Sequence, residues 1–291
     1  MNNLYEETKF ILKKYGIFAN KSLGQNFLVN ENVVKTIIEK SNITKEDLII
    51  EIGPGLGTLT KELLNYAGKV IAIELDKKMI KILTDRLGLR NNFELINDDI
   101  LKVDLNNLIN INLKNLNLKR AKIVANLPYY ITTPIIMKLL EDNLNIETIT
   151  VMIQKEVADR IIAIPGKKDS GAITYAIYYY AESEKILEVD KESFIPTPAV
   201  ESEVIKLKKR EKPPVDVKDK ELMFKIIKYA FMQRRKTLVN ALENSNIFNS
   251  KSEILEVLEA LKIDTKIRGE ALSLEDFKNI ANYITNWNLF K

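Results

Sequence analysis

Short apolar runs alternate with amphipathic stretches through the first half of the chain, and this alternation constrains the fold more than any other feature. Each run is stopped by a turn residue or a carboxylate, and two of the amphipathic stretches close on glycine, as helices prefer to do. The pattern is typical of an α/β fold, a parallel sheet with crossover helices. The four runs are DLIIEIG (47–53), KVIAIELD (69–76), NFELINDD (92–99) and KIVANLP (122–128).

The rest of the chain predicts an edge to this sheet and then a second domain. Residues 148–166 indicate a fifth strand that runs into a helix, and residues 184–209 indicate two antiparallel edge strands around a proline-rich loop. From Lys220 onward only helical periods occur. We therefore predict an α/β domain at 1–207, with an N-terminal helical segment, and a smaller all-helical domain at 208–291.

The composition excludes several classes of chemistry. The chain has no cysteine and no histidine, so disulfides, thiolate nucleophiles, Ser-His hydrolases and His-ligated zinc sites are ruled out. Of its 291 residues 46% are hydrophobic, but no apolar run reaches the roughly 18 residues that a membrane span needs. The N-terminus lacks a signal-peptide pattern, so we expect a cytoplasmic protein with no metal and no membrane partner.

The net charge of +4 is unevenly distributed along the chain. Residues 206–236 hold 12 Lys or Arg against 4 Asp or Glu, and the last three cations closely follow two aromatic residues. Clustered cations beside aromatics favour a phosphate-binding surface, and a solvated helical face is the alternative. The three cations predicted to bind RNA are Arg234, Arg235 and Lys236.

Glycines follow the first predicted strand. The sequence EIGPGLGTLT places Gly53, Gly55 and Gly57 between a strand and a helix. Glycine permits a tight turn and the close approach of a ligand to the backbone, and the helix N-terminus favours a polar or anionic group. The motif is consistent with a nucleotide-like cofactor, with a plain Gly-Pro-Gly turn as the alternative.

Acidic residues end the second and third strands. Glu74 lies 21 residues after Gly53, where a carboxylate in a doubly wound fold can bind both ribose hydroxyls. Asp98 and Asp99 close the third strand, where S-adenosylmethionine enzymes often hold the adenine amine, whereas dinucleotide folds have no such fixed need. Parallel sheets bind ligands at the carboxyl ends of their strands, so the three ends together favour S-adenosylmethionine over a set of solvated turns.

The fourth strand ends at Asn126, in the sequence VANLPYYITTP. The Asn126 side-chain oxygen and the Leu127 carbonyl, beside Pro128 with no N–H of its own, can accept the two protons of an exocyclic amine on a flat base. Such hydrogen bonds localise the amine lone pair, so methyl transfer depends on positioning more than on a strong base. Tyr129 offers a ring for stacking on that base, and Tyr130 is expected to give support.

An aromatic residue on the proline-rich loop completes the predicted acceptor pocket. Phe194 lies in the sequence SFIPTPAV, where Pro196 and Pro198 brace the loop. We expect its ring to cover the second face of the base, with packing in the core as the alternative.

Eight segments in order, from Lys21 to about Phe277, resemble the ribosomal RNA adenine N6-dimethyltransferases, and most closely the bacterial KsgA type. GxGxG alone is generic, but the combination of GQNFL, NLPYY and FxPxPxVxS is highly specific. The segments are KSLGQNFL, EIGPGLGTLT, IAIELD, NDDIL, ANLPYYITTPI, QKEVADRI, FIPTPAVES and FMQRRKTLVNAL.

The resemblance implies a Rossmann-like, S-adenosylmethionine-dependent methyltransferase domain followed by a helical domain that binds RNA. The implied substrate is a pair of adjacent adenosines in the 3′-terminal hairpin of small-subunit (16S) ribosomal RNA, each dimethylated at N6 within an assembling 30S subunit, and we expect a monomer. Carried over by motif, the cofactor-binding residues are Asn26, Leu28, Gly53, Gly55, Glu74, Asp99 and Asn126, and the acceptor pocket is formed by Asn126, Leu127, Pro128, Tyr129 and Phe194.

Two departures from the family pattern are visible. Asp169, Ser170 and Gly171 stand where the family usually shows Tyr-Gly, which could alter an RNA contact. Gly269 stands where Ala or Pro is common. Neither departure touches a predicted cofactor or acceptor position.

Three other functions compete with this prediction. The Erm type, which methylates large-subunit ribosomal RNA, more often carries NIPY without the second tyrosine. A non-catalytic RNA-binding or assembly factor would not need the intact site residues. An NAD-dependent oxidoreductase would lack a His or Cys acid–base partner and would leave NLPY unexplained.

Overall fold

The chain forms two compact units in the computed structural model, which describes residues 3–19 and 24–288. Unit 1 comprises Met1–Ala158 and Ser183–Lys209, and unit 2 comprises Asp159–Glu182 and Arg210–Lys291. The single boundary that we predicted near residue 207 lies close to the last of three crossings. The first two crossings, at which the chain enters the helical unit and returns to the sheet, were not predicted.

A seven-stranded sheet lies at the centre of unit 1, in the order β4-β3-β2-β5-β6-β9-β7. The first five strands in this order are parallel, and β9 runs antiparallel to β6. The predicted α/β class, the five parallel strands and the two edge strands are therefore confirmed. The strands are β2 (Asp47–Ile52), β3 (Lys69–Glu74), β4 (Phe93–Asn97), β5 (Arg120–Asn126), β6 (Thr148–Gln154), β7 (Ala181–Val189) and β9 (Ser202–Lys209).

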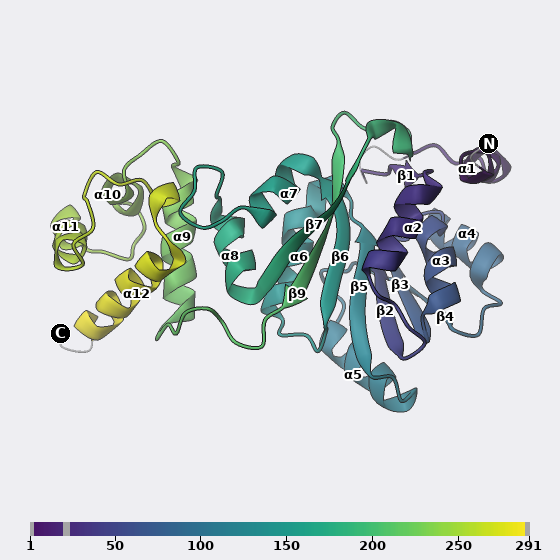
Figure 1. Cartoon of the computed structure of the whole chain (residues 1–291), viewed down its shortest axis with the longest axis horizontal. Helices are drawn as coiled ribbons and strands as arrows, with labels where there is room; N and C mark the ends of the chain where they lie inside the picture. The colour runs from purple at the N-terminus through teal and green to yellow at the C-terminus, as the bar shows by residue number, and fades with distance from the viewer. Residues whose placement is uncertain (1–2, 20–23, 289–291) are drawn as a thin grey trace. The chain divides into compact units, whose positions relative to one another are not determined.

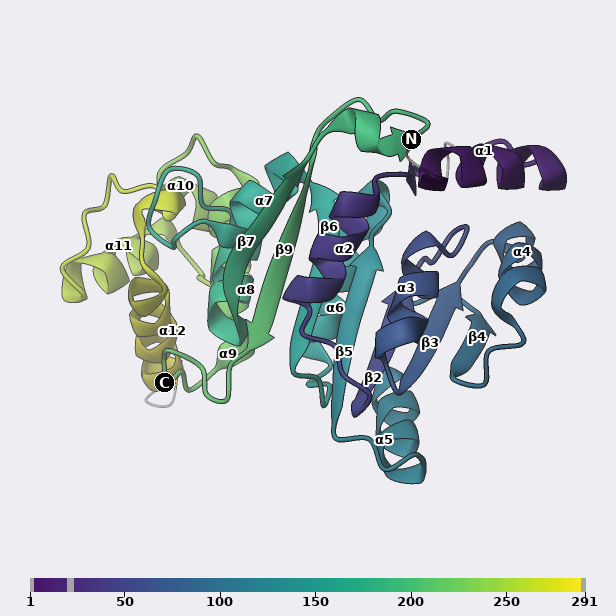
Figure 2. The ribbon, with the colours of Figure 1, turned by 45° about the vertical axis from the view of Figure 1, so that its right-hand side comes forward.

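Helices cover both faces of this sheet, with α2 and α3 in front of it and α6 behind it in Figure 2. Several begin where a short polar side chain accepts hydrogen bonds from the first turn, as Asn30, Asp76 and Asp104 do for α2, α4 and α5. The Asn- and Leu-rich stretch 105–115 of the sequence forms α5. The helices of unit 1 are α1 (Asn3–Tyr15), α2 (Glu31–Lys40), α3 (Thr58–Tyr66), α4 (Lys77–Leu87), α5 (Leu105–Asn115) and α6 (Thr132–Glu141).

A second, two-stranded sheet joins the segment after α1 to the proline-rich loop. Strand β1 (Phe27–Leu28) pairs antiparallel with β8 (Phe194–Ile195), so residues far apart in the sequence lie side by side. The first three residues of the KSLGQNFL motif lie outside the described residues. The 3₁₀ turns η2 (Tyr129–Ile131) and η3 (Lys191–Ser193) also belong to unit 1.

Unit 2 is helical and has its own core. Tyr175 and Phe277 meet there edge to face, with ring centroids 5.1 Å apart. Figure 1 labels its helices. They are α8 (Ala172–Tyr180), α9 (Lys220–Met232), α10 (Leu238–Leu242), α11 (Lys251–Ala260), η4 (Gly269–Ala271) and α12 (Leu274–Asn288), and α7 (Lys155–Ile162) spans the first crossing.

The helical period that we predicted across FMQRRKTLVNAL is broken in the structure. Helix α9 ends at Met232, Gln233 leaves the helical conformation, and a new helix starts after Thr237, whose hydroxyl accepts the Asn240 N–H. The predicted RNA-binding cations therefore lie on an exposed turn between two helices.

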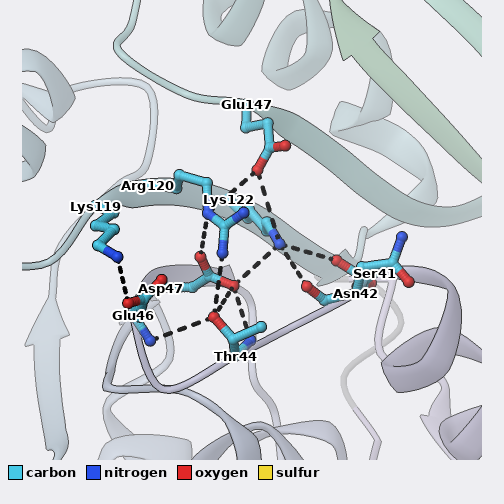
Figure 3. Close-up of polar contacts among 9 residues, drawn as sticks. All are labelled: Ser41, Asn42, Thr44, Glu46, Asp47, Lys119, Arg120, Lys122 and Glu147. Atoms are coloured by element: carbon cyan, nitrogen blue, oxygen red, sulfur yellow. Dashed lines mark hydrogen bonds and ion pairs between the residues drawn. The ribbon is translucent and has the colours of Figure 1, made fainter.

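Charged residues at the amino-terminal end of the large sheet form a network that we call the basal network: Ser41, Asn42, Thr44, Glu46, Asp47, Lys119, Arg120, Lys122 and Glu147 (Figure 3). At its centre the Lys122 ammonium lies 3.0 Å from the Asp47 carboxylate, and both side chains are almost fully buried. Lys122 also donates to the carbonyls of Ser41 and Asn42, and Arg120 donates to Asp47. Burial is the largest single influence on Asp47 and opposes its ionisation. The hydrogen bonds from Lys122 and Thr44 and the charges of Lys122 and Arg120 together outweigh it, so the pKa of Asp47 is lowered.

None of the helices in the two described ranges has the length and apolar character that a bilayer crossing requires.

Candidate active site

A pocket opens at the carboxyl ends of β2, β3, β4 and β5, within unit 1. It lies where the strand order reverses, with β3 on one side of β2 and β5 on the other, the place where doubly wound sheets bind ligands. All of the predicted cofactor and acceptor residues line it except Phe194. Those that line it are Asn26, Leu28, Gly53, Gly55, Glu74, Asp99, Asn126, Leu127, Pro128 and Tyr129.

The turn after β2 requires its glycines. Gly53, Gly55 and Gly57 all have φ between 57° and 81°, a left-handed conformation that side chains disfavour. At Gly57 a Cβ would also come within 2.9 Å of the Leu83 side chain. Any other residue at these three positions of the glycine loop (53–57) would therefore strain the backbone. Without side chains, Gly53 and Gly55 leave their backbone accessible to a ligand in the pocket.

Arg86 braces the glycine loop from outside the pocket. Its guanidinium donates to the Leu56 carbonyl and lies 2.5 Å from a carboxylate oxygen of Glu7 on α1. The N-terminal helix is thus tied, through one arginine of α4, to the loop that lines the pocket.

Glu74, at the end of β3, is positioned by backbone N–H groups. One carboxylate oxygen accepts from Gly55 (3.2 Å) and the other from Asp76 (2.8 Å). Burial raises the pKa of Glu74, and these hydrogen bonds act in the opposite direction. Each oxygen keeps a further lone pair, so the carboxylate can still accept from two hydroxyls of a ligand.

The two aspartates after β4 differ in their exposure. Asp99 is half-buried at the pocket wall and its carboxylate accepts the Leu101 N–H (3.0 Å), whereas Asp98 is exposed and accepts the Asp99 N–H (2.7 Å). Asp99 is therefore the better placed of the two for a ligand amine, as its selection over Asp98 in the predicted set anticipated.

The end of β5 presents an amide oxygen to the pocket. The Asn126 side-chain nitrogen donates to the Asn26 carbonyl (3.2 Å), so the side-chain oxygen is the atom left to accept a hydrogen bond. The next residue, Leu127, is fixed by its own N–H, which donates to the Met152 carbonyl of β6 (3.1 Å). This hydrogen bond between Asn26 and Asn126, which are 100 residues apart, holds the β1 segment against the carboxyl end of β5.

Tyr129 and Tyr130 differ in the structure, as the sequence analysis expected. Tyr129 is half-buried, and its hydroxyl lies 2.6 Å from the Ser202 hydroxyl. Burial raises the pKa of Tyr129 and the hydrogen bond to Ser202 counteracts this in part, so the phenol stays protonated. Tyr130 is 56% exposed and lies at the pocket rim beside Gly24.

Phe194 does not take the position that we predicted for it. Only 2% of its surface is exposed, and it packs in the hydrophobic cluster of unit 1, paired with Leu28 across the small sheet. The core-packing alternative describes this structure, because pairing of β8 with β1 turns the ring into the domain rather than toward the pocket.

Glu51, the residue before the last of β2, lines the pocket and was missed by the sequence analysis. Its side chain is buried, and within the described residues one carboxylate oxygen has no hydrogen-bond partner. Burial raises its pKa to about 8, and the nearby Glu74 charge adds to the shift. A carboxylate inside the apolar run IIEIG was the available signal.

The predicted RNA-binding residues lie in unit 2. Arg234, Arg235 and Lys236 are all exposed, but Arg234 also donates to the carbonyls of Lys168 and Ser170. Arg234 therefore helps to hold the loop of the first departure.

The residues at both departures from the family pattern make specific contacts within unit 2. The buried Ser170 hydroxyl donates to the carbonyls of Lys167 and Glu270, so this loop is tied to η4. At Gly269 a Cβ would come within 2.8 Å of the Ala230 Cβ on α9. The glycine thus permits a close approach of η4 to α9.

The fold and the pocket define a Rossmann-like methyltransferase architecture, and comparison with known proteins gives the family. The model of the family described as "Ribosomal RNA adenine dimethylase" matches residues 17–286, so the chain belongs to this family of methyltransferases. The resemblance that we drew from the motifs is confirmed.

Relatives with similar sequences share one name. The chain is 48% identical to the protein "Ribosomal RNA small subunit methyltransferase A" of Clostridioides difficile (strain 630), over 96% of each chain. It is 47% identical to the protein of the same name from Bacillus pumilus (strain SAFR-032), over 95% of each chain.

Solved structures agree on the architecture. A dimethyladenosine transferase from Plasmodium falciparum superposes with a TM-score of 0.74 at 27% identity, covering 90% of this chain and 98% of that one. The 23S rRNA methyltransferase ErmE superposes with a TM-score of 0.65 at 23% identity, covering 89% of this chain and all of that one. The second similarity shows the fold alone.

Proposed function

We propose that this protein transfers methyl groups from S-adenosylmethionine to N6 of two adjacent adenosines in the 3′-terminal hairpin of small-subunit (16S) ribosomal RNA. We further propose that it acts as a monomer in the cytoplasm, on RNA within an assembling 30S subunit. The observation that carries the proposal is the convergence of four strand ends on one pocket, with the acceptor loop (126–131) next to the glycine loop.

The lining of the pocket fits S-adenosylmethionine. This cofactor bears positive charge, and the buried Glu51 carboxyl, with an oxygen that lacks a partner among the described residues, suits a cationic group. Glu74 would accept from the ribose hydroxyls and Asp99 from the adenine amine, while the glycine loop lets the backbone approach the ligand. Asn26 and Leu28 would close the pocket from the β1 side.

The acceptor loop would orient the target amine. S-adenosylmethionine supplies an electrophilic methyl group, and each transfer forms an N–C bond, breaks an S–C bond and releases a proton from N6. The Asn126 side-chain oxygen and the Leu127 carbonyl would accept the two amine protons, which directs the lone pair toward the methyl group. Tyr129 would stack on the base and Pro128 adds no competing N–H.

Two observations favour the small-subunit substrate over the Erm alternative. The relatives that match at 47–48% identity carry a small-subunit name, whereas the Erm-type structure matches at 23%. The chain also has NLPYYITTPI where the Erm type more often has NIPY.

The test is transfer of a tritiated methyl group from S-adenosylmethionine to small ribosomal subunits that lack the modification, with the labelled nucleosides identified by mass spectrometry. We expect dimethyladenosine at two adjacent positions. Label in large-subunit RNA would support the Erm alternative, and no label in either RNA would contradict the enzyme proposal.

The basic turn after α9 would bind the RNA backbone. Replacing Arg235 by Ala should weaken subunit binding and flatten its salt dependence, because fewer counterions are released. Arg234→Ala should in addition loosen the loop at Lys168 and Ser170. Unchanged binding by both variants would return this turn to the solvated-face alternative.

A further inference from the structure

A side-chain hydrogen bond attaches the acceptor loop to β9, which lies between β6 and β7 in the sheet. The hydroxyls of Tyr129 and Ser202 lie 2.6 Å apart, although the residues are 73 positions apart in the sequence. Ser202 is fully buried at the first position of β9, and Tyr129 is half-buried at the pocket. The bond therefore joins a residue of the pocket to one that does not line it.

Ser202 is held in a rigid setting. It pairs with Gln154 in the antiparallel ladder of β6 and β9. The residue before it, Glu201, accepts the Lys155 N–H through its carbonyl (3.0 Å) and pairs with the Lys155 ammonium through its carboxylate (3.3 Å). The backbone that carries the Ser202 hydroxyl is thus held by the β6–β9 ladder and by the contacts of Glu201 with Lys155.

Tyr129, by contrast, begins the short turn η2. Among the described residues no side chain caps this turn, which is closed by a backbone bond from Ile131 to Pro128 and a side-chain bond from Thr132 to Pro128. An aromatic ring on a short turn has freedom about its side-chain torsions unless its far end is held. The Ser202 hydroxyl holds the far end of this ring.

We propose that Ser202 is a positioning residue that sets the orientation of the Tyr129 ring against the target base, an inference that rests on the proposed methyl transfer to adenosine. The Tyr129 hydroxyl is engaged with Ser202, so the proposal assigns the action of Tyr129 on the base to its ring. A site residue on a loop reaches productive geometry only when a rigid neighbour supports it, which is the relation of Ser202 to Tyr129.

Two substitutions remove this hydrogen bond from opposite sides. Ser202→Ala removes the hydroxyl of β9, and Tyr129→Phe removes the phenol oxygen but keeps the ring. We expect each to lower kcat for methyl transfer to small subunits by about tenfold, because misplacement of a reactant by a fraction of an ångström slows the chemical step. The affinity for S-adenosylmethionine, measured by calorimetry, should stay within about twofold, since both changes lie at the acceptor end.

The double variant separates positioning from general loosening of the fold. If the two hydroxyls act only through each other, Ser202→Ala combined with Tyr129→Phe should be no slower than the slower single variant. Thr150→Val is the matched control, because Thr150 is also a buried hydroxyl residue on the neighbouring strand β6 and its oxygen has no partner among the described residues. It should leave kcat unchanged.

Three outcomes would overturn the inference. Ser202→Ala with the kcat of the unaltered protein would show that the bond does not matter, and effects that multiply in the double variant would show that the two residues act separately. A loss of kcat in Thr150→Val equal to that in Ser202→Ala would assign both to general destabilisation. If the unaltered protein transfers no methyl group, the proposed function fails first, and the inference with it.

Discussion

Two buried carboxylates lie on the same strand of unit 1, Asp47 and Glu51, and their pKa values are shifted in opposite directions. Asp47 begins β2 in the basal network, where Lys122 and Arg120 contact it and its pKa is lowered (Figure 3). Glu51, four residues further along β2, lines the pocket and forms no ion pair within the part of the chain that the structure describes, and burial raises its pKa to about 8. The comparison teaches that partners, and not burial alone, decide whether a buried carboxylate stabilises the fold or stays available to a ligand.

The largest effect is expected at the basal network. Replacing Lys122 by Met removes the ammonium at its centre and leaves Asp47 with a weaker set of partners. Loss of one partner of a buried pair costs about 3–5 kcal/mol, and the remaining bonds from Arg120 and Thr44 place this variant at about 3 kcal/mol of unfolding free energy. Urea denaturation measures it.

A matched control lies in the same network. Lys119 pairs with Glu46 on the surface, so Lys119→Ala should cost less than about 1 kcal/mol. Equal losses for Lys119→Ala and Lys122→Met would mean that burial of the basal network does not set its contribution.

The second effect concerns the pocket end and appears in catalysis. Asn126→Ala removes the amide oxygen that would orient the target amine, and we expect methyl transfer to fall by at least about a hundredfold. The affinity for S-adenosylmethionine should change little. Loss of cofactor binding without a slower chemical step would show that Asn126 serves the cofactor instead.

The third effect is the change of the free energy of unfolding with pH that Glu51 should cause. Its pKa is raised in the folded protein, so the folded state holds the proton more tightly than the unfolded chain. The resulting stability is fully present below the unfolded pKa of about 4.3 and is lost as pH rises toward 8. Relative to Glu51→Gln, the protein without ligand should therefore lose at least about 1 kcal/mol between pH 5 and pH 9.

Binding of the cofactor should stabilise the unaltered protein more than the Glu51→Gln variant. Glu51→Gln should bind S-adenosylmethionine about tenfold more weakly, because the neutral amide cannot pair with a cationic group. Denaturation at pH 5, 7 and 9 with and without the cofactor gives both quantities. Parallel stability curves for the two proteins would contradict the raised pKa of Glu51.

The smallest effect is expected at Arg86 and its partner. Glu7→Gln weakens the contact through which Arg86 braces the glycine loop, and an ion pair that is partly exposed contributes about 1 kcal/mol or less. Cofactor affinity should fall by roughly twofold to fivefold with little change in kcat. Glu6→Gln, on the same helix at an exposed position, should leave it unchanged.

Much of the site could be predicted because its residues follow buried strands. Glu74, Asp99 and Asn126 each come at the point where an apolar run stops, and parallel strands bring such points to one edge of the sheet. Glu51 escaped notice for the same reason, since it stands inside a run and not at its end.

Contacts between distant segments could not be predicted. The pairing of β1 with β8 buries Phe194, and no local pattern around that residue announces a partner 166 positions earlier. The end of α9 had only a weak signal, the capping side chain of Thr237 within a sequence that has neither proline nor glycine. The segment Asp159–Glu182 belongs to unit 2 because its apolar side chains are buried there. A helical period alone does not reveal in which unit a helix buries its apolar face.

The core around Tyr175 can be completed only late in the synthesis of the chain. Its hydroxyl donates to the carbonyl of Leu272, and its ring packs against Phe277, so its burial depends on residues made about a hundred positions later. The sheet of unit 1 has all its strands once Lys209 has left the ribosome. Until the last helix follows, Tyr175 of α8 can pack against Phe231 of α9 but lacks its contact with Phe277, so a nascent chain stalled before that point would leave this side of the ring uncovered.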